Sequence, residues 1–305
     1  MADEYLTPSE RPRQVGVNAE KALQPRWLGP VLVLASAVLF SFSGVLTKAI
    51  DAGSWTILTW RGIVGAAGIA AYVRYRNSHR RLRDVFRVGR DGWILAVVGG
   101  VGSVTFIVAF KNTFVANVSV IYATIPFVAA ILERLILGEP IRRRTFYAAA
   151  ASLVGVVIIV SGSLGSPNLD GDAVAIAMVG LNALYMVLIR TFTNTDAVLA
   201  GAASGPLLFI AGWFFTDPLN VSASDAVLLV VFGLVFAGAT VLWIEGTRLI
   251  PAAESGLLGS AETPVAIAMA WLILSEAPPL ASIIGAVIVL TTVLAHARFD
   301  FKPAG

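Results

Sequence analysis

The sequence has no cysteine and only two histidines among its 305 residues. The absence of cysteine excludes disulfide bonds, thiol nucleophiles and iron–sulfur clusters. Neither His79 nor His296 has an acidic cluster beside it in the sequence, so the pattern does not favour a zinc or di-iron site. We therefore expect a protein without a metal or other cofactor.

Charged residues are also scarce. They make up 13% of the chain, against about 25% in soluble domains, while 57% of the residues are hydrophobic and the mean hydropathy is +0.81. A chain of this length and composition cannot cover its own apolar surface, so lipid must do so. The few basic residues lie in short loops between apolar segments, which argues against a nucleic-acid-binding patch.

The apolar residues fall into segments of about 20 residues, the length that a helix needs to cross the hydrocarbon core. The segments are too long and too continuously apolar for the strands of a β-barrel. We therefore predict an all-α integral membrane protein with about ten transmembrane helices. The predicted helices cover residues 29–49, 54–74, 92–111, 116–137, 145–163, 172–190, 197–215, 225–246, 251–274 and 279–296.

The positions of Lys and Arg predict the orientation of these helices. Of the 22 basic residues, all except Lys48, Arg61 and Lys111 fall in segments that lie on one side when ten helices are threaded through a membrane. The positive-inside rule places that side in the cytoplasm. We expect a multi-pass protein of the inner (plasma) membrane, with residues 1–28 and 298–305 as cytoplasmic tails. The first of these tails has no apolar core and is not a secretory signal.

Two stretches of the sequence resemble each other. IPFVAAILERLILGEP, residues 125–140, aligns with TPVAIAMAWLILSEAP, residues 263–278. The alignment pairs Pro126 with Pro264, and it pairs Glu139 with Glu276 after a slip of one residue. We expect the two glutamates, which close their helices, to have structural or capping roles.

The alignment divides the chain into two repeats, residues 29–163 and 172–297, of five helices each. Because five is an odd number, the second repeat must enter the membrane from the opposite side to the first. Inverted repeats are typical of secondary transporters, which hold their substrate near the middle of the membrane between the two repeats.

The doubled pattern of a mid-helix proline and a closing (G/S)-E resembles the EamA-type permeases of the drug/metabolite transporter superfamily. A basic residue ends the first helix of each half, Lys48 and Arg190, and Arg61 stands in a WRG sequence; both features are similar to that family. The resemblance covers residues 30–297. It implies that helices one to four and six to nine surround a central cavity. Ala148 departs from the family pattern, which often has a glycine there, whereas Gly285 keeps the equivalent glycine in the second half.

Glu262 is the leading candidate for transport. It lies 11 residues past Pro251 and therefore about 16 Å along its helix, near the middle of the membrane. Ionisable groups inside a membrane are costly, so they are functional candidates by default. Such a carboxyl suits proton binding or recognition of a cationic amine. The alternative is a neutral, hydrogen-bonded Glu between helices. Thr124 is its equivalent in the first repeat.

Pro126 and Pro264 each remove one helical hydrogen bond and are predicted to kink their helices. We expect the carbonyls of Tyr122 and Ser260 to be left free for a partner. The kinks can act in gating, can shape the wall of the cavity, or can serve helix packing alone.

Arg61 is predicted to lie well inside the second helix. It can bind a substrate carboxylate, pair with an internal acid, or extend outward to the membrane surface without any function. Asn182 and Tyr185 are three residues apart on one helical face and are candidates for substrate binding. Trp60, Trp243 and Trp271 are weaker candidates, because Trp also anchors helices at the membrane surface.

These features predict a permease that moves a small metabolite, amino acid or drug-like amine by alternating access, with a proton gradient as the simplest driving force. The alternatives are a lipid-modifying enzyme and a membrane subunit without transport activity. An enzyme would generally need an acid/base or metal constellation, and the predicted helices carry none. Small residues such as Ser152, Gly155 and Gly285 favour helix contacts within one chain or, as the second choice, in a homodimer.

Overall fold

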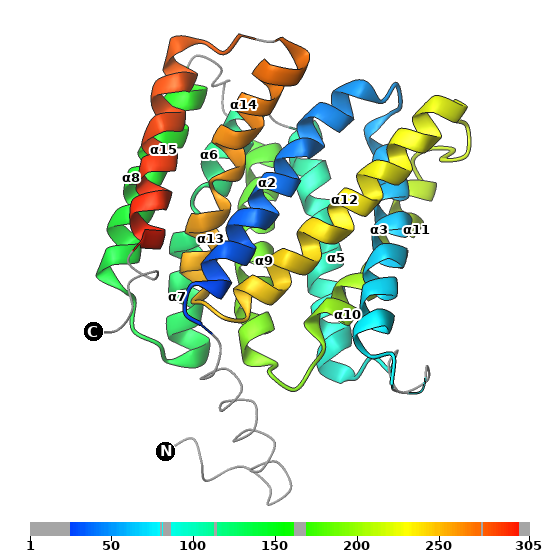
Figure 1. The fold of residues 1–305 in the computed structure, drawn as a ribbon, viewed down its shortest axis with the longest axis horizontal. Helices are drawn as coiled ribbons and strands as arrows, with labels where there is room; N and C mark the ends of the chain where they lie inside the picture. Colours follow the sequence, from blue (N-terminus) through cyan, green and yellow to red (C-terminus); the bar gives the residue numbers. More distant parts are fainter. Residues whose placement is uncertain are drawn as a thin grey trace, which may run out of the picture.

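The computed structural model describes residues 25–79, 81, 87–112, 115–161, 169–275 and 277–298. In these residues the regular elements are helices, arranged as one bundle (Figure 1). They are α2 (Leu28–Ala49), α3 (Ser54–Arg76), α5 (Arg90–Asn112), α6 (Val115–Tyr122), α7 (Ile125–Leu137), α8 (Arg143–Val160), α9 (Leu169–Thr191), α10 (Ala197–Ala203), α11 (Gly205–Trp213), α12 (Ala223–Thr247), α13 (Ala252–Gly259), α14 (Glu262–Leu274) and α15 (Leu280–Arg298).

The predicted all-helical membrane fold is confirmed. Among the described residues, 8 spans are long and apolar enough to cross a membrane. The pairs α6–α7 and α13–α14 each form one such span, α10–α11 forms a shorter apolar stretch, and α5 has 23 residues. Every predicted segment therefore coincides with a helix or a pair of helices. The start of α2 and the end of α15 lie at the same end of the bundle (Figure 1), which we call the termini face.

The helix contacts repeat between the two halves of the chain. α2 packs against α12 and α14. Its equivalent in the second half, α9, packs in the same way against α5 and α7, which are the equivalents of α12 and α14. Three further contacts join equivalent predicted spans directly. The second and seventh spans meet through α3 and α11, the fourth and ninth through α7 and α13, and the fifth and tenth through α8 and α15. Contacts of this kind are what two copies of one five-helix unit give when one copy is inverted and docked on the other.

The fourth and ninth predicted helices are interrupted at equivalent places. α6 and α13 have 8 residues each, and α7 and α14 have 13 each. Pro126 and Pro264 stand in the first turns of α7 and α14, as their predicted kinks require. Thr124, before α7, donates its side-chain hydroxyl to the carbonyl of Ile121 at 2.6 Å.

One detail of this prediction is wrong. The carbonyl of Ser260 is not left free by Pro264, because it accepts a hydrogen bond from the backbone N–H of Thr263 at 3.3 Å. The chain tightens into a three-residue turn, which restores the bond that proline removes. Both α7 and α14 then end on a residue in the left-handed conformation, Gly138 with φ 70° and Ser275 with φ 57°.

The small residues that the sequence places on α8 and α15 face each other within the chain. A Cβ atom added to Gly285 would lie 2.4 Å from the carbonyl oxygen of Gly155, and one added to Gly155 would lie 2.9 Å from the carbonyl oxygen of Gly285. The two backbones can approach this closely only because both residues lack a side chain.

We expect Gly285→Ala to lower the stability of the folded protein, because its methyl group would overlap the backbone of α8. Overpacking of this kind typically costs about 1–3 kcal/mol. The matched control is Gly180→Ala, since an added Cβ there meets nothing within 4 Å. Thermal unfolding of the purified variants in detergent measures the difference. Equal melting temperatures for the two variants would contradict the close α8–α15 contact.

Candidate functional site

A cavity lies between the two halves, close to the two interrupted helices. It has a volume of about 300 Å³ for the centres of water-sized molecules. Its wall comes mainly from α2, α5, α6, α9, α12 and the residues around the α13–α14 break. Among the described residues, α3 and α15 contribute none to the wall and α8 contributes only Val156. The cavity thus follows the arrangement that the family resemblance implies, except that α3 stands behind the wall.

The two interrupted helices cross at the cavity. Gly256 of α13 packs on the start of α7, where an added Cβ would lie 3.1 Å from the side chain of Ile125 and 3.4 Å from the nitrogen of Pro126. All three residues line the cavity. The repeated breaks therefore bring the same part of each half to one place in the middle of the bundle.

Glu262 begins α14 and lines this cavity. It is half-buried, and we assign its accessible surface to the cavity. The charge of its carboxylate interacts with Arg61 and with the hydroxyl of Tyr122. Tyr122 lines the cavity from α6 and stacks edge-on against Phe106, with ring centroids 6.0 Å apart. The acidic group predicted from the sequence is thus placed among aromatic rings.

Arg61 lies behind the wall and not in it. Its guanidinium carbon is 4.6 Å from the ring centroid of Phe236, a cation–π contact, and Phe236 lines the cavity from α12. The charge of Arg61 also interacts with that of Glu262, and the three roles that the sequence left open for Arg61 stay predictions.

Asn182 and Tyr185 both line the cavity from α9. The amide of Asn182 donates to the carbonyl of Met178 at 2.9 Å. The ring of Tyr185 stacks on that of Trp243 with centroids 5.8 Å apart and an interplanar angle of 13°. Trp243, which the sequence ranked below these two, lines the cavity as well.

Of the remaining candidates, some line the cavity and others do not. Pro126 lines the cavity, whereas Thr124 and Pro264 stand beside residues that do. Sequence reasoning missed the rings of Phe40, Phe106, Tyr122 and Phe236, because an aromatic residue in an apolar segment cannot be distinguished from one that faces lipid. Glu276 lies outside the described residues.

An ion-pair cluster joins the two halves near the termini face. Arg190, at the end of α9, donates through both terminal nitrogens to the carboxylate of Glu139, at 2.9 and 3.1 Å. It also pairs with Glu133 of α7. The Glu133 carboxylate in turn accepts the backbone N–H of Ala252, at the start of α13, at 2.9 Å. The closing Glu139 is therefore part of a contact between the halves.

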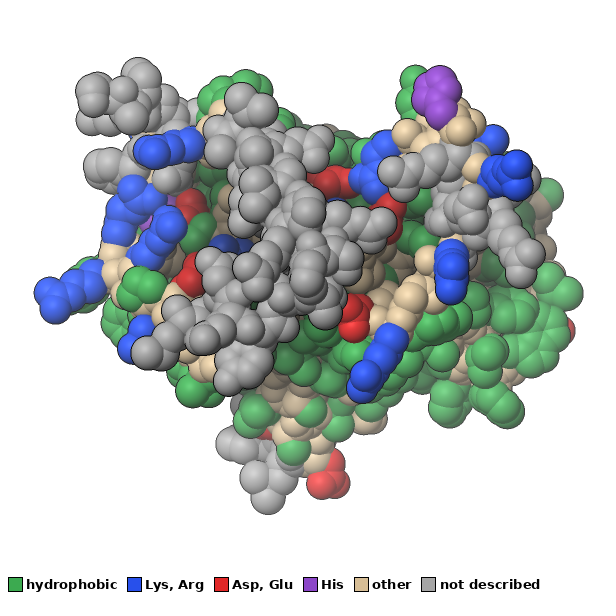
Figure 2. Space-filling model, turned by 90° about the horizontal axis from the view of Figure 1, so that it is seen from below, with side chains coloured by type: hydrophobic (Ala, Val, Ile, Leu, Met, Phe, Trp, Pro, Cys, Tyr) green, Lys and Arg blue, Asp and Glu red, His purple; other side chains and the backbone are tan. Residues whose placement is uncertain are grey.

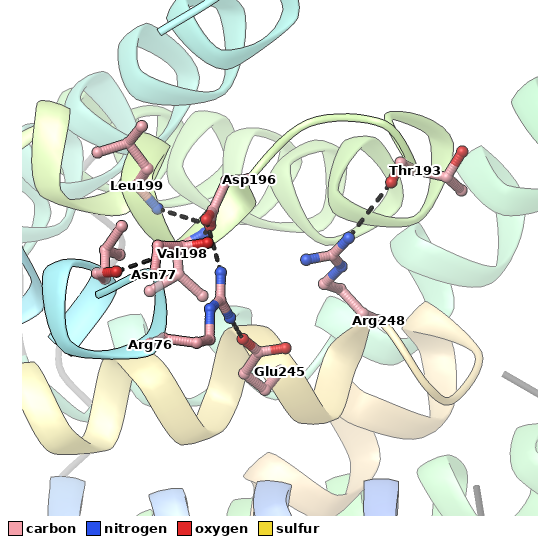
Figure 3. A network of polar contacts seen from close by, with 9 residues as sticks. Arg76, Asn77, Thr193, Asp196, Val198, Leu199, Glu245 and Arg248 are labelled. Atoms are coloured by element: carbon pink, nitrogen blue, oxygen red, sulfur yellow. Dashed lines mark hydrogen bonds and ion pairs between the residues drawn. The ribbon is translucent and has the colours of Figure 1, made fainter. Parts of the chain in front are cut away.

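A second cluster of polar contacts also joins the halves (Figure 3). Arg76, at the end of α3, pairs with Asp196 at 2.5 Å and with Glu245 of α12. Asp196 also accepts the backbone N–H groups of Val198 and Leu199, both at 3.1 Å, and so caps α10. Arg248 donates to the carbonyl of Thr193 at 3.3 Å.

Basic and acidic side chains are spread over the termini face (Figure 2). The described arginines there include exposed residues such as Arg143 and Arg298 as well as the paired Arg76 and Arg190. This is the distribution that the positive-inside rule describes for one side of a membrane protein.

Comparisons with known proteins agree with this architecture. Residues 27–161 match the EamA-like transporter family. None of the curated proteins compared with the chain matches it. A solved crystal structure, described only as that of a protein, has a TM-score of 0.77 and covers 90% of this chain and 99% of its own. The sequence identity is 18%, so this likeness shows the fold alone.

Proposed function

We propose that this chain, which belongs to the EamA-like transporter family of the drug/metabolite transporter superfamily, is a secondary transporter that works by alternating access. Membership in the family makes it a permease in general. The further steps are that it binds a small metabolite, amino acid or amine in the central cavity and releases it on the other side. A proton gradient drives this movement if Glu262 gains and loses a proton during the cycle.

The observation that carries this proposal is the position of the cavity. It lies between the two halves of the chain, and both interrupted helices meet there. The repeated helix contacts support two units of inverted orientation. Two such units can tilt about the shared site and expose it to one side at a time. The ion-pair clusters of Arg76 and Arg190 support this mechanism, because they join the units at the termini face only through side chains that can separate.

We further propose that the termini face is cytoplasmic and that residues 29–163 and 172–297 are the two moving units. The arginines of that face support the orientation. Labelling of residues at both ends of the chain in intact cells and in inverted vesicles tests it. Ends that react on different sides of the membrane would contradict it.

Reconstitution in sealed liposomes tests the transport function. A thermal-shift screen against a panel of metabolites first finds solutes that bind, because a ligand of the folded state raises its melting temperature. The flux of each radiolabelled hit is then measured with and without a pH gradient, next to protein-free liposomes. Solute flux supports transport, turnover of the liposome lipids would indicate an enzyme, and neither would indicate a subunit without transport activity.

A further inference from the structure

The cavity wall carries charge of only one sign. Among the described residues that line it, Glu262 is the only one with a formal charge. Both the nearest guanidinium, of Arg61, and the arginines of the termini face lie outside this wall. A bound anion would therefore meet no cation in the wall, whereas a bound cation would meet a carboxylate.

Aromatic rings line the same cavity as this carboxylate. Six aromatic side chains line the cavity, namely Phe40, Phe106, Tyr122, Tyr185, Phe236 and Trp243. The face of an aromatic ring attracts a cation, and tyrosine and tryptophan rings do so most strongly once water is excluded. A carboxylate within a cage of such rings is a general arrangement for recognising ammonium groups.

The serine hydroxyls of the wall also bear on the charge of the ligand. Ser36, Ser204 and Ser260 line the cavity, and each donates its hydroxyl hydrogen to a carbonyl three residues earlier in its own helix, at 2.7, 2.7 and 2.6 Å. A hydroxyl has one hydrogen to donate and two lone pairs that accept. With its hydrogen used within the chain, the half-buried Ser204 keeps lone pairs that can accept from the N–H groups of a cation. Ser36 is only 1% exposed, and Ser260 also shares a hydrogen bond of 2.9 Å with the hydroxyl of Ser152.

We propose that the cavity selects an organic cation, a protonated amine with a flat apolar body, over an anion or a zwitterion of the same size. This inference rests on the proposed transport function, for which it names the class of substrate. The ammonium group binds at Glu262, and the apolar body lies against the stacked rings of Tyr185 and Trp243. Arg61 holds the ring of Phe236 from behind and compensates the charge of Glu262 when no ammonium group is bound.

Four probes of one shape test this selection. They are 2-phenylethylamine, a cation; 2-phenylethanol, which is neutral; 3-phenylpropionate, an anion; and phenylalanine, a zwitterion. Binding to the purified full chain is measured by thermal shift and by calorimetry. The amine is expected to raise the melting temperature in a concentration-dependent manner. The neutral and the anionic probe lack the ammonium group and are expected to bind at least about tenfold more weakly, as expected for loss of one charge-assisted hydrogen bond. Phenylalanine keeps the ammonium group but adds a carboxylate that meets no cation in the wall, and is expected to bind more weakly for that reason.

Two variants assign the binding to this wall. Glu262→Gln is expected to remove the preference for the amine, and Trp243→Leu is expected to weaken amine binding by roughly 2- to 10-fold, because the apolar body loses its aromatic stacking partner. The matched control is Asp170→Asn, which removes one carboxylate at the exposed start of α9 and is expected to bind the amine like the parent chain. The unliganded melting temperature of each variant shows that it is folded.

A stronger response to 3-phenylpropionate or phenylalanine than to the amine would overturn the inference. So would an amine response that is unchanged in both Glu262→Gln and Trp243→Leu, or the absence of any amine response in the parent chain. The transport function fails in a different experiment. Flux of an anionic or neutral hit into sealed liposomes would overturn the cation preference and leave transport standing, whereas absence of flux for every bound solute would count against transport itself.

Discussion

Glu262→Gln is expected to reduce coupled transport to the level of protein-free liposomes while the protein still folds. Glutamine has nearly the same shape as glutamate, but its amide can neither carry a negative charge nor exchange a proton at neutral pH. The interactions that the structure shows for Glu262 are electrostatic, with Arg61 and Tyr122. The substitution therefore removes a charge from the cavity wall and keeps a side chain of nearly the same volume.

The size of the effect follows from the kind of contact that is lost. A hydrogen bond to a charged group contributes about 1.5–3 kcal/mol, which corresponds to roughly 10- to 150-fold in binding. Loss of proton exchange removes coupling altogether, so the pH gradient should no longer drive accumulation even at saturating solute. Uptake of a radiolabelled hit into liposomes, with an imposed pH gradient and with none, measures both effects separately.

Two further variants make the result interpretable. Glu262→Asp keeps the carboxyl group, moved back by one methylene, and should retain part of the gradient-driven uptake. Asp170→Asn removes an exposed carboxylate and should transport like the parent chain. Gradient-driven uptake at the parent rate in Glu262→Gln, with an unchanged melting temperature, would remove this residue from the coupling mechanism.

The path of the chain through the membrane could be predicted from the sequence because it depends on two local quantities, hydropathy and segment length. Residues 172–190, for example, are apolar apart from Asp172, Asn182 and the closing Arg190, and α9 spans Leu169–Thr191. The break between α10 and α11 was not predicted. Pro206, in the first turn of α11, is its sequence signal, since proline cannot donate a helical hydrogen bond.

The candidate site could be predicted only where a polar residue interrupts an apolar segment. Glu262 and Asn182 stand out in this way, and both line the cavity. The position of Arg61 in its apolar segment predicts how deep it lies in the membrane. It does not predict toward which neighbour the side chain points, and the structure places Arg61 behind Phe236. Rotation depends on how helices pack, which involves residues far apart in the chain.

The contact between Arg190 and Glu139 illustrates the same limit. Both residues were recognised separately, as the basic end of one helix and the acidic end of another. Their bidentate contact joins residues from different halves, and only the packing of the two halves against each other brings them together. Pairing across the halves is therefore the part of the mechanism that the structure adds.

This pairing leads to the second large effect that we expect. Replacing Arg76 and Arg190 together by alanine should open the cavity toward the termini face. Each arginine joins two carboxylates of the opposite half. The double variant therefore removes four ion pairs between the halves and leaves the pair of Arg142 with Glu254, at 3.5 Å, in place. Since a charged hydrogen bond contributes about 1.5–3 kcal/mol, loss of even one should shift the ratio of open to closed forms about tenfold or more.

The absence of cysteine from the chain makes this opening measurable. Ser103 lines the cavity from α5 and is half-buried, so Ser103→Cys provides a single thiol in the wall. A maleimide that cannot cross the membrane is added to vesicles from the side of the termini face, and the rate of labelling is followed. We expect the rate to rise about tenfold when Arg76→Ala and Arg190→Ala are added.

The control carries Arg143→Ala and Arg298→Ala in the same Ser103→Cys background. These two arginines are exposed on the same face, so their loss changes the surface charge by the same amount. The control should be labelled at the parent rate, and the melting temperature of each variant shows that it is folded. Equal labelling of the two double variants would mean that the clusters do not close the cavity, because a contact that holds two halves together must allow them to separate when it is removed.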